Sequence, residues 1–261
     1  MTIVVVPYHQ DQPLPDGLIP LPRTGEFLVL QPHLPAGGDV WDRMAALHDA
    51  AAEQIAAAVR TGEPTTVLSG DCLVAMAVLA GAQRAGAHPG VVWFDAHGDV
   101  HTLDTSTSGY LGGLALRLVL GAHPDRLATP LRAHPVSEER VVLVDARDLD
   151  PPEAEFLASL RIRRSPVAGL DEAGLPDGPL LLHVDLDVID PDELPGLLFP
   201  APGGPSAGQV VDAVHRVLAT GRVTVLDIAC PWHPAAGEPA QQARIDLLRA
   251  LTGGQAAVKN R

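Results

Sequence analysis

Two short runs of the sequence hold the residue types that bind divalent metal ions in proteins. The first run is Asp95-Ala96-His97-Gly98-Asp99, where three possible ligands alternate with small residues. The second begins with Asp185 and Asp187 in the stretch Asp-Leu-Asp-Val-Ile-Asp-Pro, and each run follows an apolar, strand-like segment. Alternate side chains of an extended chain point to the same side, so we expect the ligands of each run to share one strand face and converge. Carboxylates gathered in this way repel one another unless cations neutralise them.

Two further polar clusters follow apolar runs: Ser69-Gly70-Asp71-Cys72 and the stretch from Arg147 to Glu153. A single aspartate at such a place is usually a helix cap or a turn residue. Metal binding explains the combination of Asp-x-His-x-Asp with Asp-x-Asp better than capping or turn formation does, because charged side chains are seldom buried unpaired. Carboxylate and imidazole ligands together suit an ion such as Mn²⁺, and shared carboxylates suit two ions roughly 3.5–4 Å apart that hold a hydroxide between them.

The segments that must position these clusters alternate between strand-like and helix-like patterns. The runs that predict strands are 3–6, 27–30, 66–68, 91–94, 141–144, 180–184 and 223–228. The runs that predict helices are 39–59, 74–84, 114–120, 153–160, 206–219 and 240–251. This alternation predicts an α/β fold with three layers, α/β/α, around a mainly parallel sheet, in one catalytic domain over residues 1–261. Ligands of such sheets bind beyond the carboxyl ends of the strands, and the Pro/Gly-rich segment 194–205 predicts a long functional loop.

The composition excludes several classes of partner. The chain has 261 residues, a net charge of −14 and no basic cluster, so we expect neither nucleic acid nor an anionic membrane as a partner, whereas cationic ligands are favoured. No apolar stretch is long enough to span a bilayer, and the N-terminal run is typical of a first strand and not of a signal peptide. The two cysteines, Cys72 and Cys230, lie far apart, which favours a reducing, cytoplasmic setting over a disulfide.

In their order and spacing the motifs resemble those of the arginase, agmatinase and formimidoylglutamase (ureohydrolase) superfamily. That superfamily shows Gly-Gly-Asp-His, Asp-Ala-His-x-Asp and Asp-x-Asp-x-x-Asp-Pro, to which residues 69–72, 95–99 and 185–191 correspond here. The resemblance runs from about Val67 to the end of the chain. It implies an arginase-like fold, two Mn²⁺ ions per chain and hydrolysis of a C–N bond in a guanidino substrate. It implies one ion bound by Cys72, Asp95, Asp99 and Asp185, and a second bound by Asp95, His97, Asp185 and Asp187.

The same resemblance implies how the substrate is held. Residues 99–113 match the substrate loop of arginases without a gap. Ser108 falls where arginases bind an amino-acid carboxylate, and Asp150 and Glu153 fall where they recognise the α-amino group, so the implied substrate is a small guanidino amino acid. The full set of implied substrate contacts is His101, Ser106, Ser108, Tyr110, Asp150, Glu153 and Cys230.

Three residues depart from the superfamily pattern. Cys72 stands where arginases have a histidine ligand, Gly112 where they have a proton-shuttling histidine, and Cys230 where they have a glutamate that pairs with the guanidinium. A thiolate is a competent ligand, although it softens one site toward zinc. Without the glutamate, a fully cationic guanidinium loses a charge-assisted partner, whereas a less basic N-hydroxylated guanidine does not need one.

This combination resembles the Nω-hydroxy-L-arginine hydrolases, which are arginase relatives of antibiotic (D-cycloserine) biosynthesis. The resemblance implies attack of a metal-bridging hydroxide on the guanidino carbon of Nω-hydroxy-L-arginine, giving L-ornithine and hydroxyurea. We expect Asp99 to carry a proton to the leaving amine and Asp150 and Glu153 to orient the amino-acid end.

Other interpretations remain open from the sequence. An ordinary ureohydrolase acting on arginine or another guanidino acid is the first alternative, and a metal-binding arginase-fold module without activity is the second. A deacetylase of a related fold and a disulfide between Cys72 and Cys230 are less favoured. The segment Thr252-Gly253-Gly254 is expected to end the last helix. The tail that joins arginase subunits into trimers is not recognisable after it, which favours a monomer.

Overall fold

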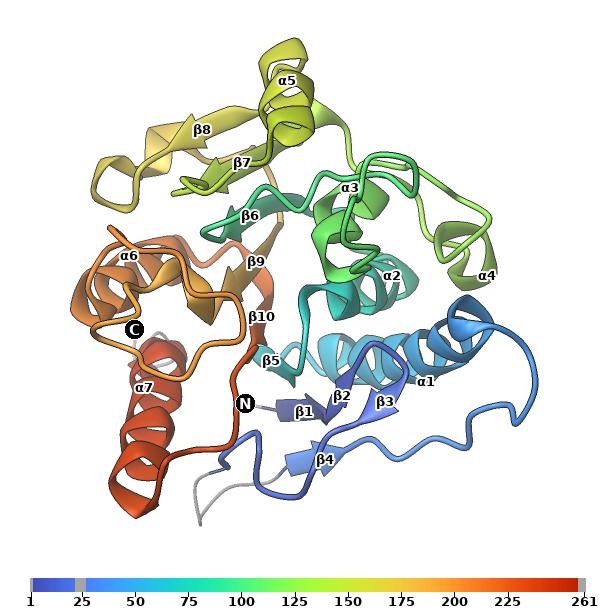
Figure 1. Ribbon diagram of the computed structural model, residues 1–261, viewed down its shortest axis with the longest axis horizontal. Helices are drawn as coiled ribbons and strands as arrows, with labels where there is room; N and C mark the ends of the chain where they lie inside the picture. The colour runs from blue at the N-terminus through green and yellow to red at the C-terminus, as the bar shows by residue number, and fades with distance from the viewer. Residues whose placement is uncertain (1, 22–26, 258–261) are drawn as a thin grey trace.

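The computed structural model describes residues 2–21 and 27–257, and within them an eight-stranded parallel sheet forms the centre of the molecule (Figure 1). The strands lie in the order β4-β1-β5-β10-β9-β6-β7-β8. Their bounds are β1 (Thr2–Val6), β4 (Phe27–Val29), β5 (Thr65–Ser69), β6 (Gly90–Phe94), β7 (Val141–Val144), β8 (Arg163–Ser165), β9 (Leu180–Asp185) and β10 (Val223–Ala229). Beside the sheet, β2 (Tyr8–His9) and β3 (Gln12–Pro13) form a short antiparallel hairpin. The expected mainly parallel sheet is confirmed.

Helices cover both faces of this sheet, with α6 and α7 on the face opposite α1 to α4 (Figure 1). Side chains of one strand divide between two apolar cores, since Val4 packs in one and Val5 in the other. The predicted three-layer α/β/α architecture is therefore confirmed. The helices are α1 (Val40–Arg60), α2 (Ala75–Arg84), α3 (Ala115–Val119), α4 (Ala128–Leu131), α5 (Pro151–Ser159), α6 (Ala207–Ala219) and α7 (Glu238–Ala257).

Local sequence explains where the two long amphipathic helices begin. The Asp39 carboxylate accepts hydrogen bonds from the amides of Trp41 and Asp42, and the Asp42 carboxylate accepts one from the Asp39 amide. Ser206 and Gln209 form the same reciprocal box at the start of α6. Each box satisfies amides that a helix start leaves unpaired, so α1 and α6 begin directly after these capping residues.

Three parts of the fold differ from the sequence expectation. Strand β8 was not predicted, because its sequence Arg-Arg-Ser carries no apolar run and it pairs only at the edge of the sheet. The same holds for the small polar hairpin of β2 and β3. The prediction that the last helix ends before Thr252 is wrong: the Thr252 hydroxyl bonds back to the Leu248 carbonyl oxygen at 2.9 Å, and α7 continues to Ala257. None of the described helices is both long and apolar enough to cross a membrane.

His48 is a fully buried titratable residue of α1, and neither ring nitrogen has a hydrogen-bond partner within the described chain. Burial lowers the pKa of His48 from 6.5 to about 4. Above pH 6.5 the ring is neutral in the folded and the unfolded chain. Between pH 6.5 and 4 only the unfolded chain binds the proton, so the free energy of unfolding falls as the pH falls.

We expect a His48→Leu variant to lose this acid sensitivity. Relative to wild type, its free energy of unfolding should rise by up to about 3 kcal/mol between pH 7 and pH 4, because a pKa shift of one unit is worth about 1.4 kcal/mol. Urea unfolding of both metal-free proteins at pH 7, 5 and 4 measures this difference. A difference that stays constant across these pH values would show that His48 does not titrate as burial predicts.

Candidate metal centre

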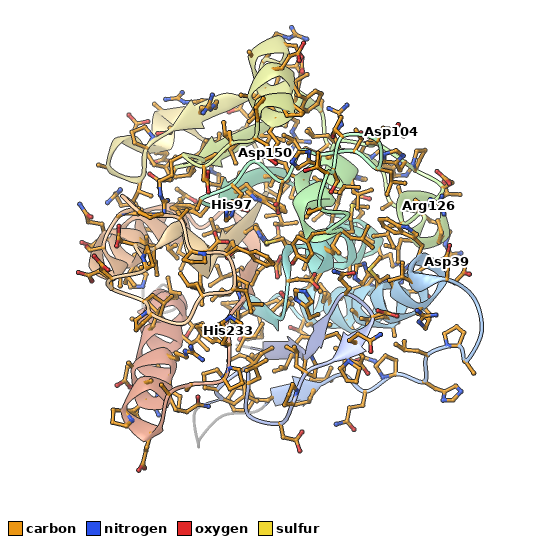
Figure 2. All side chains as sticks on the ribbon, in the orientation of Figure 1. Asp39, His97, Asp104, Arg126, Asp150 and His233 are labelled. Carbon is orange, nitrogen blue, oxygen red and sulfur yellow. The ribbon has the colours of Figure 1, made fainter. Side chains whose placement is uncertain are left out.

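A cavity of about 320 Å³ opens at the carboxyl edge of the sheet. Its wall collects residues at or just after the ends of β5, β6, β7, β9 and β10, together with residues of the loops 100–113 and 189–206. In Figure 2, His97 and Asp150 lie near the middle of the view, whereas Asp39, at the start of α1, and Arg126, just before α4, lie at the periphery. The polar clusters singled out in the sequence therefore meet at one site, as expected for an open parallel sheet.

The loop after β6 brings its three predicted ligands together by a route that strand alternation did not predict. Strand β6 ends at Phe94, and Asp99 adopts a left-handed backbone conformation with φ of +52°. Asp95 is fixed by two donors, the Trp93 indole at 2.9 Å and the His97 amide at 2.7 Å. The interpretation that one extended face aligns these ligands is wrong, because a tight loop directs them instead.

The same correction applies to the end of β9. The strand stops at Asp185, and a single 3-10 turn, Leu186–Val188, carries Asp187. The Asp185 carboxylate caps this turn by accepting a hydrogen bond of 2.8 Å from the Asp187 amide. Asp185 and Asp187 thus reach the cavity through a capped turn and not from one strand face.

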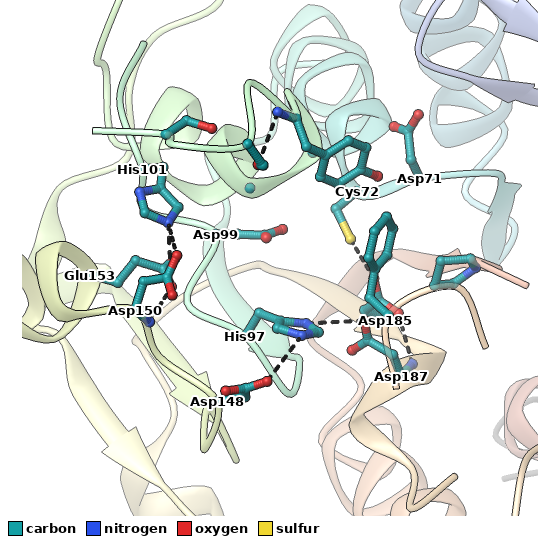
Figure 3. A pocket seen from close by; sticks show the side chains of 17 residues that line it. Asp71, Cys72, His97, Asp99, His101, Asp148, Asp150, Glu153, Asp185 and Asp187 are labelled. Atoms are coloured by element: carbon teal, nitrogen blue, oxygen red, sulfur yellow. Dashed lines mark hydrogen bonds and ion pairs between the residues drawn. The ribbon is translucent and has the colours of Figure 1, made fainter. Parts of the chain in front are cut away.

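Cys72 reaches the centre from the start of another short turn, Cys72–Val74, directly after β5. Asp71 caps this turn through the Leu73 amide at 2.9 Å, and its other oxygen accepts a hydrogen bond from the Gln10 amide of the hairpin. The Cys72 thiol lies 2.7 Å from an Asp185 oxygen, and both residues are buried (Figure 3).

The structure gathers two sets of potential ligand atoms that share Asp95, and within each set the atoms lie within 4.8 Å of one another. The first set is Cys72, Asp95 and Asp99, and the second is Asp95, His97 and Asp187. Asp185 adjoins the first set through Cys72. The buried Oδ2 atom of Asp99 has no hydrogen-bond partner in the described chain, which is a costly condition for a carboxylate unless a cation is bound. This donor set fits two divalent ions.

The electrostatics of the carboxylate cluster support the same conclusion. Burial and the charge of Asp95 raise the pKa of Asp99 well above its usual value, and burial with Asp187 does the same for Asp185. Burial and Asp95 also raise the pKa of Asp187 to about 6. So many carboxylates cannot ionise together without a compensating positive charge.

His97 is the basic group of this cluster. Its Nδ1 atom lies 3.1 Å from an Asp187 oxygen and 3.4 Å from an Asp95 oxygen. Burial alone would lower its pKa, but the bonds to Asp187 and Asp95 prevail and raise it to about 12. A histidine binds metal only as the neutral ring, so metal binding here must release this proton.

A second cluster of three side chains lies across the cavity from the first. His101 Nε2 is 3.1 Å from an Asp150 oxygen and 3.9 Å from a Glu153 oxygen (Figure 3). Glu153 is buried and accepts hydrogen bonds from the amides of Val100 and Asp150, both at 3.2 Å, whereas the Asp150 side chain is 61% exposed. Glu153 therefore stabilises the start of α5, and Asp150 presents its carboxylate to the cavity.

The structure gathers almost all of the predicted substrate contacts in the cavity wall. The contacts found there are His101, Ser106, Ser108, Tyr110, Asp150 and Glu153. Cys230 is different: it is 1% exposed, and the next residue, Pro231, lines the cavity instead. Burial and nearby Asp185 raise the pKa of the Cys230 thiol well above its usual value, so it carries no charge toward the cavity.

Three residues of the site were not named individually from the sequence. Asp148, from the predicted polar cluster 147–153, and Phe199 line the cavity, and the His9 ring from β2 stacks on Tyr110 with a centroid distance of 5.6 Å. Phe199 sits in the predicted long loop, which is confirmed as segment 189–206 without a helix or strand. The position of His9 depends on the hairpin, and no motif marks it.

Arg147 holds this loop against the sheet. Its guanidinium donates hydrogen bonds to the carbonyl oxygens of Val188 at 3.0 Å and Ala201 at 2.7 Å, and also reaches those of Asp187 and Pro202. It pairs with the Asp145 carboxylate at 2.5 Å. The base of the loop is therefore fixed by backbone contacts.

A buried row of side chains runs beneath the cavity on three adjacent strands. His183 of β9 bonds to Asp227 of β10 at 2.7 Å, and both side chains are fully buried. The His183 ring stacks on Trp93 of β6 at a centroid distance of 3.8 Å, and Trp93 donates to Asp95. This row supports Asp95, which both ligand sets share, from below.

A family description, the sequences of known proteins and solved structures agree on which proteins this chain is similar to. A family description named "Arginase family" matches residues 33–243. The arginase of Bacillus caldovelox is 35% identical over 171 residues, which cover 58% of this chain and 57% of that protein. The crystal structure of arginase from Bacillus cereus superposes with a TM-score of 0.80 at 25% identity, over 100% of this chain and 99% of that one.

A further structure, Entamoeba histolytica arginase in complex with L-ornithine, shares the fold with a TM-score of 0.79 at 21% identity, over 97% of this chain and 98% of that one. The chain spans about half to three fifths of the length of the curated relatives that it matches first.

Proposed function

The chain belongs to the arginase family, and we propose from this premise that it hydrolyses a C–N bond in a guanidino amino acid with two Mn²⁺ ions. The observation that carries the proposal is the pair of ligand sets that share Asp95 at the end of β6. One ion would be held by Cys72, Asp95, Asp99 and Asp185, and the other by Asp95, His97, Asp185 and Asp187. When bound, the two ions would supply hydroxide near neutral pH by lowering the pKa of water.

The protein's own residues would bind and orient the substrate. Asp150 points an exposed carboxylate into the cavity and suits the substrate's α-amino group, with His101 held beside it at 3.1 Å. Both Glu153 oxygens already accept backbone hydrogen bonds, so Glu153 would act mainly by positioning Asp150. Ser106 and Ser108, on the same wall, would hold the carboxylate end. Fixing both groups aligns the guanidino carbon and lowers the entropic part of the barrier.

The proton needed by the leaving amine is assigned to Asp99. One oxygen of its carboxylate would bind an ion, and the other would exchange a proton with a group in the cavity. Asp99 also lines the cavity wall directly. A carboxyl in this position satisfies the requirement that a proton carrier lie within reach of the reacting nitrogen.

We further propose that the preferred substrate is Nω-hydroxy-L-arginine, with L-ornithine and hydroxyurea as products. The support is the lack of a carboxylate at position 230, where a buried, neutral thiol stands behind Pro231. A weakly basic guanidine needs no anion there, whereas a full guanidinium gains from one. An ordinary arginase is the second candidate, because the acidic wall formed by Asp148, Asp150 and the ligands also suits a cation.

Steady-state assays with Mn²⁺-loaded protein test both the proposed hydrolase activity and the proposed preference for the hydroxylated substrate. We expect kcat/KM for Nω-hydroxy-L-arginine to exceed that for L-arginine by at least about 10-fold, which corresponds to about 1.4 kcal/mol of transition-state preference. Hydroxyurea and urea are measured separately, with ornithine as the common product. Faster urea release from L-arginine would replace the first candidate with the second, and no turnover of either compound would refute the hydrolase proposal.

A further inference from the structure

The ring of Tyr110 occupies the space that a side chain at position 112 would fill. A Cβ atom built on Gly112 would lie 2.4 Å from the Tyr110 ring and 2.5 Å from its hydroxyl oxygen. Such approaches do not occur in packed proteins, so one of the two groups must give way. Gly112 has no left-handed backbone angle, and its lack of a side chain is therefore required by the tyrosine and not by the backbone.

Two other aromatic rings hold Tyr110 in this place. His9 stacks on it nearly parallel, with an interplanar angle of 14°, and Phe199 packs against it with a centroid distance of 4.7 Å. These rings come from the β2–β3 hairpin and from the loop 189–206, which lie far apart in sequence. The ring of Tyr110 is therefore fixed from both sides and is not a mobile surface group.

The Tyr110 hydroxyl is an available donor at the reacting end of the cavity. It lines the same cavity as Cys72 and Asp99 of the first ligand set. Burial and the charges of Asp71, Cys72, Asp99 and Asp185 raise the pKa of its hydroxyl, which therefore stays protonated and able to donate. It has no hydrogen-bond partner among the side chains and backbone groups of the described chain, although Tyr110 lines the cavity. The protein uses neither the donor nor the acceptor capacity of this hydroxyl, so both are available to a ligand in the cavity.

We propose that Tyr110 is a specificity-determining residue whose hydroxyl donates a hydrogen bond to the oxygen on the hydroxylated guanidino nitrogen of the substrate. This inference rests on the proposed function and names the group that recognises its distinguishing atom. A cationic guanidinium carries only N–H donors and offers no acceptor to a phenol, whereas an N-hydroxyguanidine offers an oxygen. Gly112 is the residue that makes room for this contact.

The first test removes only the hydroxyl. We expect Tyr110→Phe to lower kcat/KM for Nω-hydroxy-L-arginine by about 10-fold, the usual effect of one lost neutral hydrogen bond, and to change it by less than about 2-fold for L-arginine. The manganese content and the affinity for L-ornithine should stay at the wild-type values, because ornithine lacks the guanidino carbon. An equal loss with both substrates, or no loss, would overturn the proposal.

The second test addresses the steric pairing with a matched control. Gly112→Ala should lower kcat/KM for the hydroxylated substrate as much as Tyr110→Ala does, because the new methyl displaces the ring. When Gly112→Ala is added to Tyr110→Ala, kcat/KM for the hydroxylated substrate should fall by less than a further factor of about 2, because the ring that the methyl would meet is absent. Gly113→Ala adds a methyl only 3.5 Å from His101, an ordinary contact, and should stay within about 3-fold of wild type. If the two substitutions lowered kcat/KM independently, so that their factors multiplied in the double variant, Gly112 and the Tyr110 ring would not act as a pair.

These outcomes separate the two proposals. If wild-type protein hydrolyses neither guanidino compound, the proposed function fails and this assignment fails with it. If wild type is active but Tyr110→Phe affects both substrates alike, the hydrolase remains and only the role of Tyr110 is lost. The double variant Tyr110→Ala/Gly112→Ala lacks the clash, so it reports on the pairing even if Gly112→Ala alone folds poorly.

Discussion

An Asp187→Ala variant is expected to lose metal and turnover together. Asp187 belongs to one ligand set, lies 3.1 Å from His97, and also accepts a hydrogen bond from the Ala96 amide, which ties the loops after β6 and β9 together. Changes that only touch a ligand's supporting contacts cost about 10- to 100-fold in metal affinity, so loss of the ligand itself should cost more than about 100-fold. At limiting Mn²⁺ the activity should fall below about 1% of wild type.

Elemental analysis and turnover on the same protein sample measure this effect. Asp192→Asn is the matched control, because this exposed carboxylate lies five residues further on and should leave metal content and activity unchanged. Near-normal activity of Asp187→Ala with one bound ion would contradict the two-ion proposal. Normal occupancy by two ions without activity would show that Asp187 is not a ligand.

The second large effect is expected at the buried pair of His183 and Asp227. Replacing Asp227 with Ala leaves a fully buried imidazole without its partner at 2.7 Å. Removing one member of a buried pair costs about 3–5 kcal/mol of unfolding free energy. For a chain of this length that corresponds to a drop in Tm of roughly 6–20 °C. Chemical and thermal unfolding of the metal-free protein would measure it without the contribution of bound ions.

A double variant provides the control for this pair. His183→Leu/Asp227→Leu removes both polar groups and fills the same space with apolar atoms, so its stability should lie closer to wild type than that of Asp227→Ala. Equal losses in the two variants would mean that volume and not the polar pair determines stability. A loss below about 1 kcal/mol in Asp227→Ala would show that the pair contributes little.

The sequence predicted the sheet and the ligand clusters because both depend on local patterns. Continuous apolar runs such as Val91 to Phe94 are recognisable without the rest of the chain, and the polar residues after them had to meet at one edge of a parallel sheet. How the ligands converge was predicted wrongly, since Asp99 relies on a left-handed backbone angle and Asp187 on a capped turn. Neither feature follows from residue spacing.

The features that could not be predicted from the sequence depend on contacts between segments that are distant in the chain. The stacking of His9, Tyr110 and Phe199 requires the hairpin, the loop 100–113 and the loop 189–206 to meet, and no periodicity encodes such a meeting. The placement of Cys230 behind Pro231 likewise depends on one turn of the backbone after β10. Strand β8 forms because β7 offers a free edge, although its own sequence is polar.

The way in which Arg147 holds the loop 189–206 bears on how this molecule can diversify. Its guanidinium bonds to backbone carbonyl oxygens, which every amino acid possesses, so these contacts at the base of the loop do not depend on the side chain at position 199. Mutations at Phe199 therefore alter the entrance of the chamber at little expense to folding. Substitutions at this position can therefore change which substrates the cavity accepts during evolution. The proposed metal ligands tolerate fewer substitutions, because each of them is needed to bind the ions.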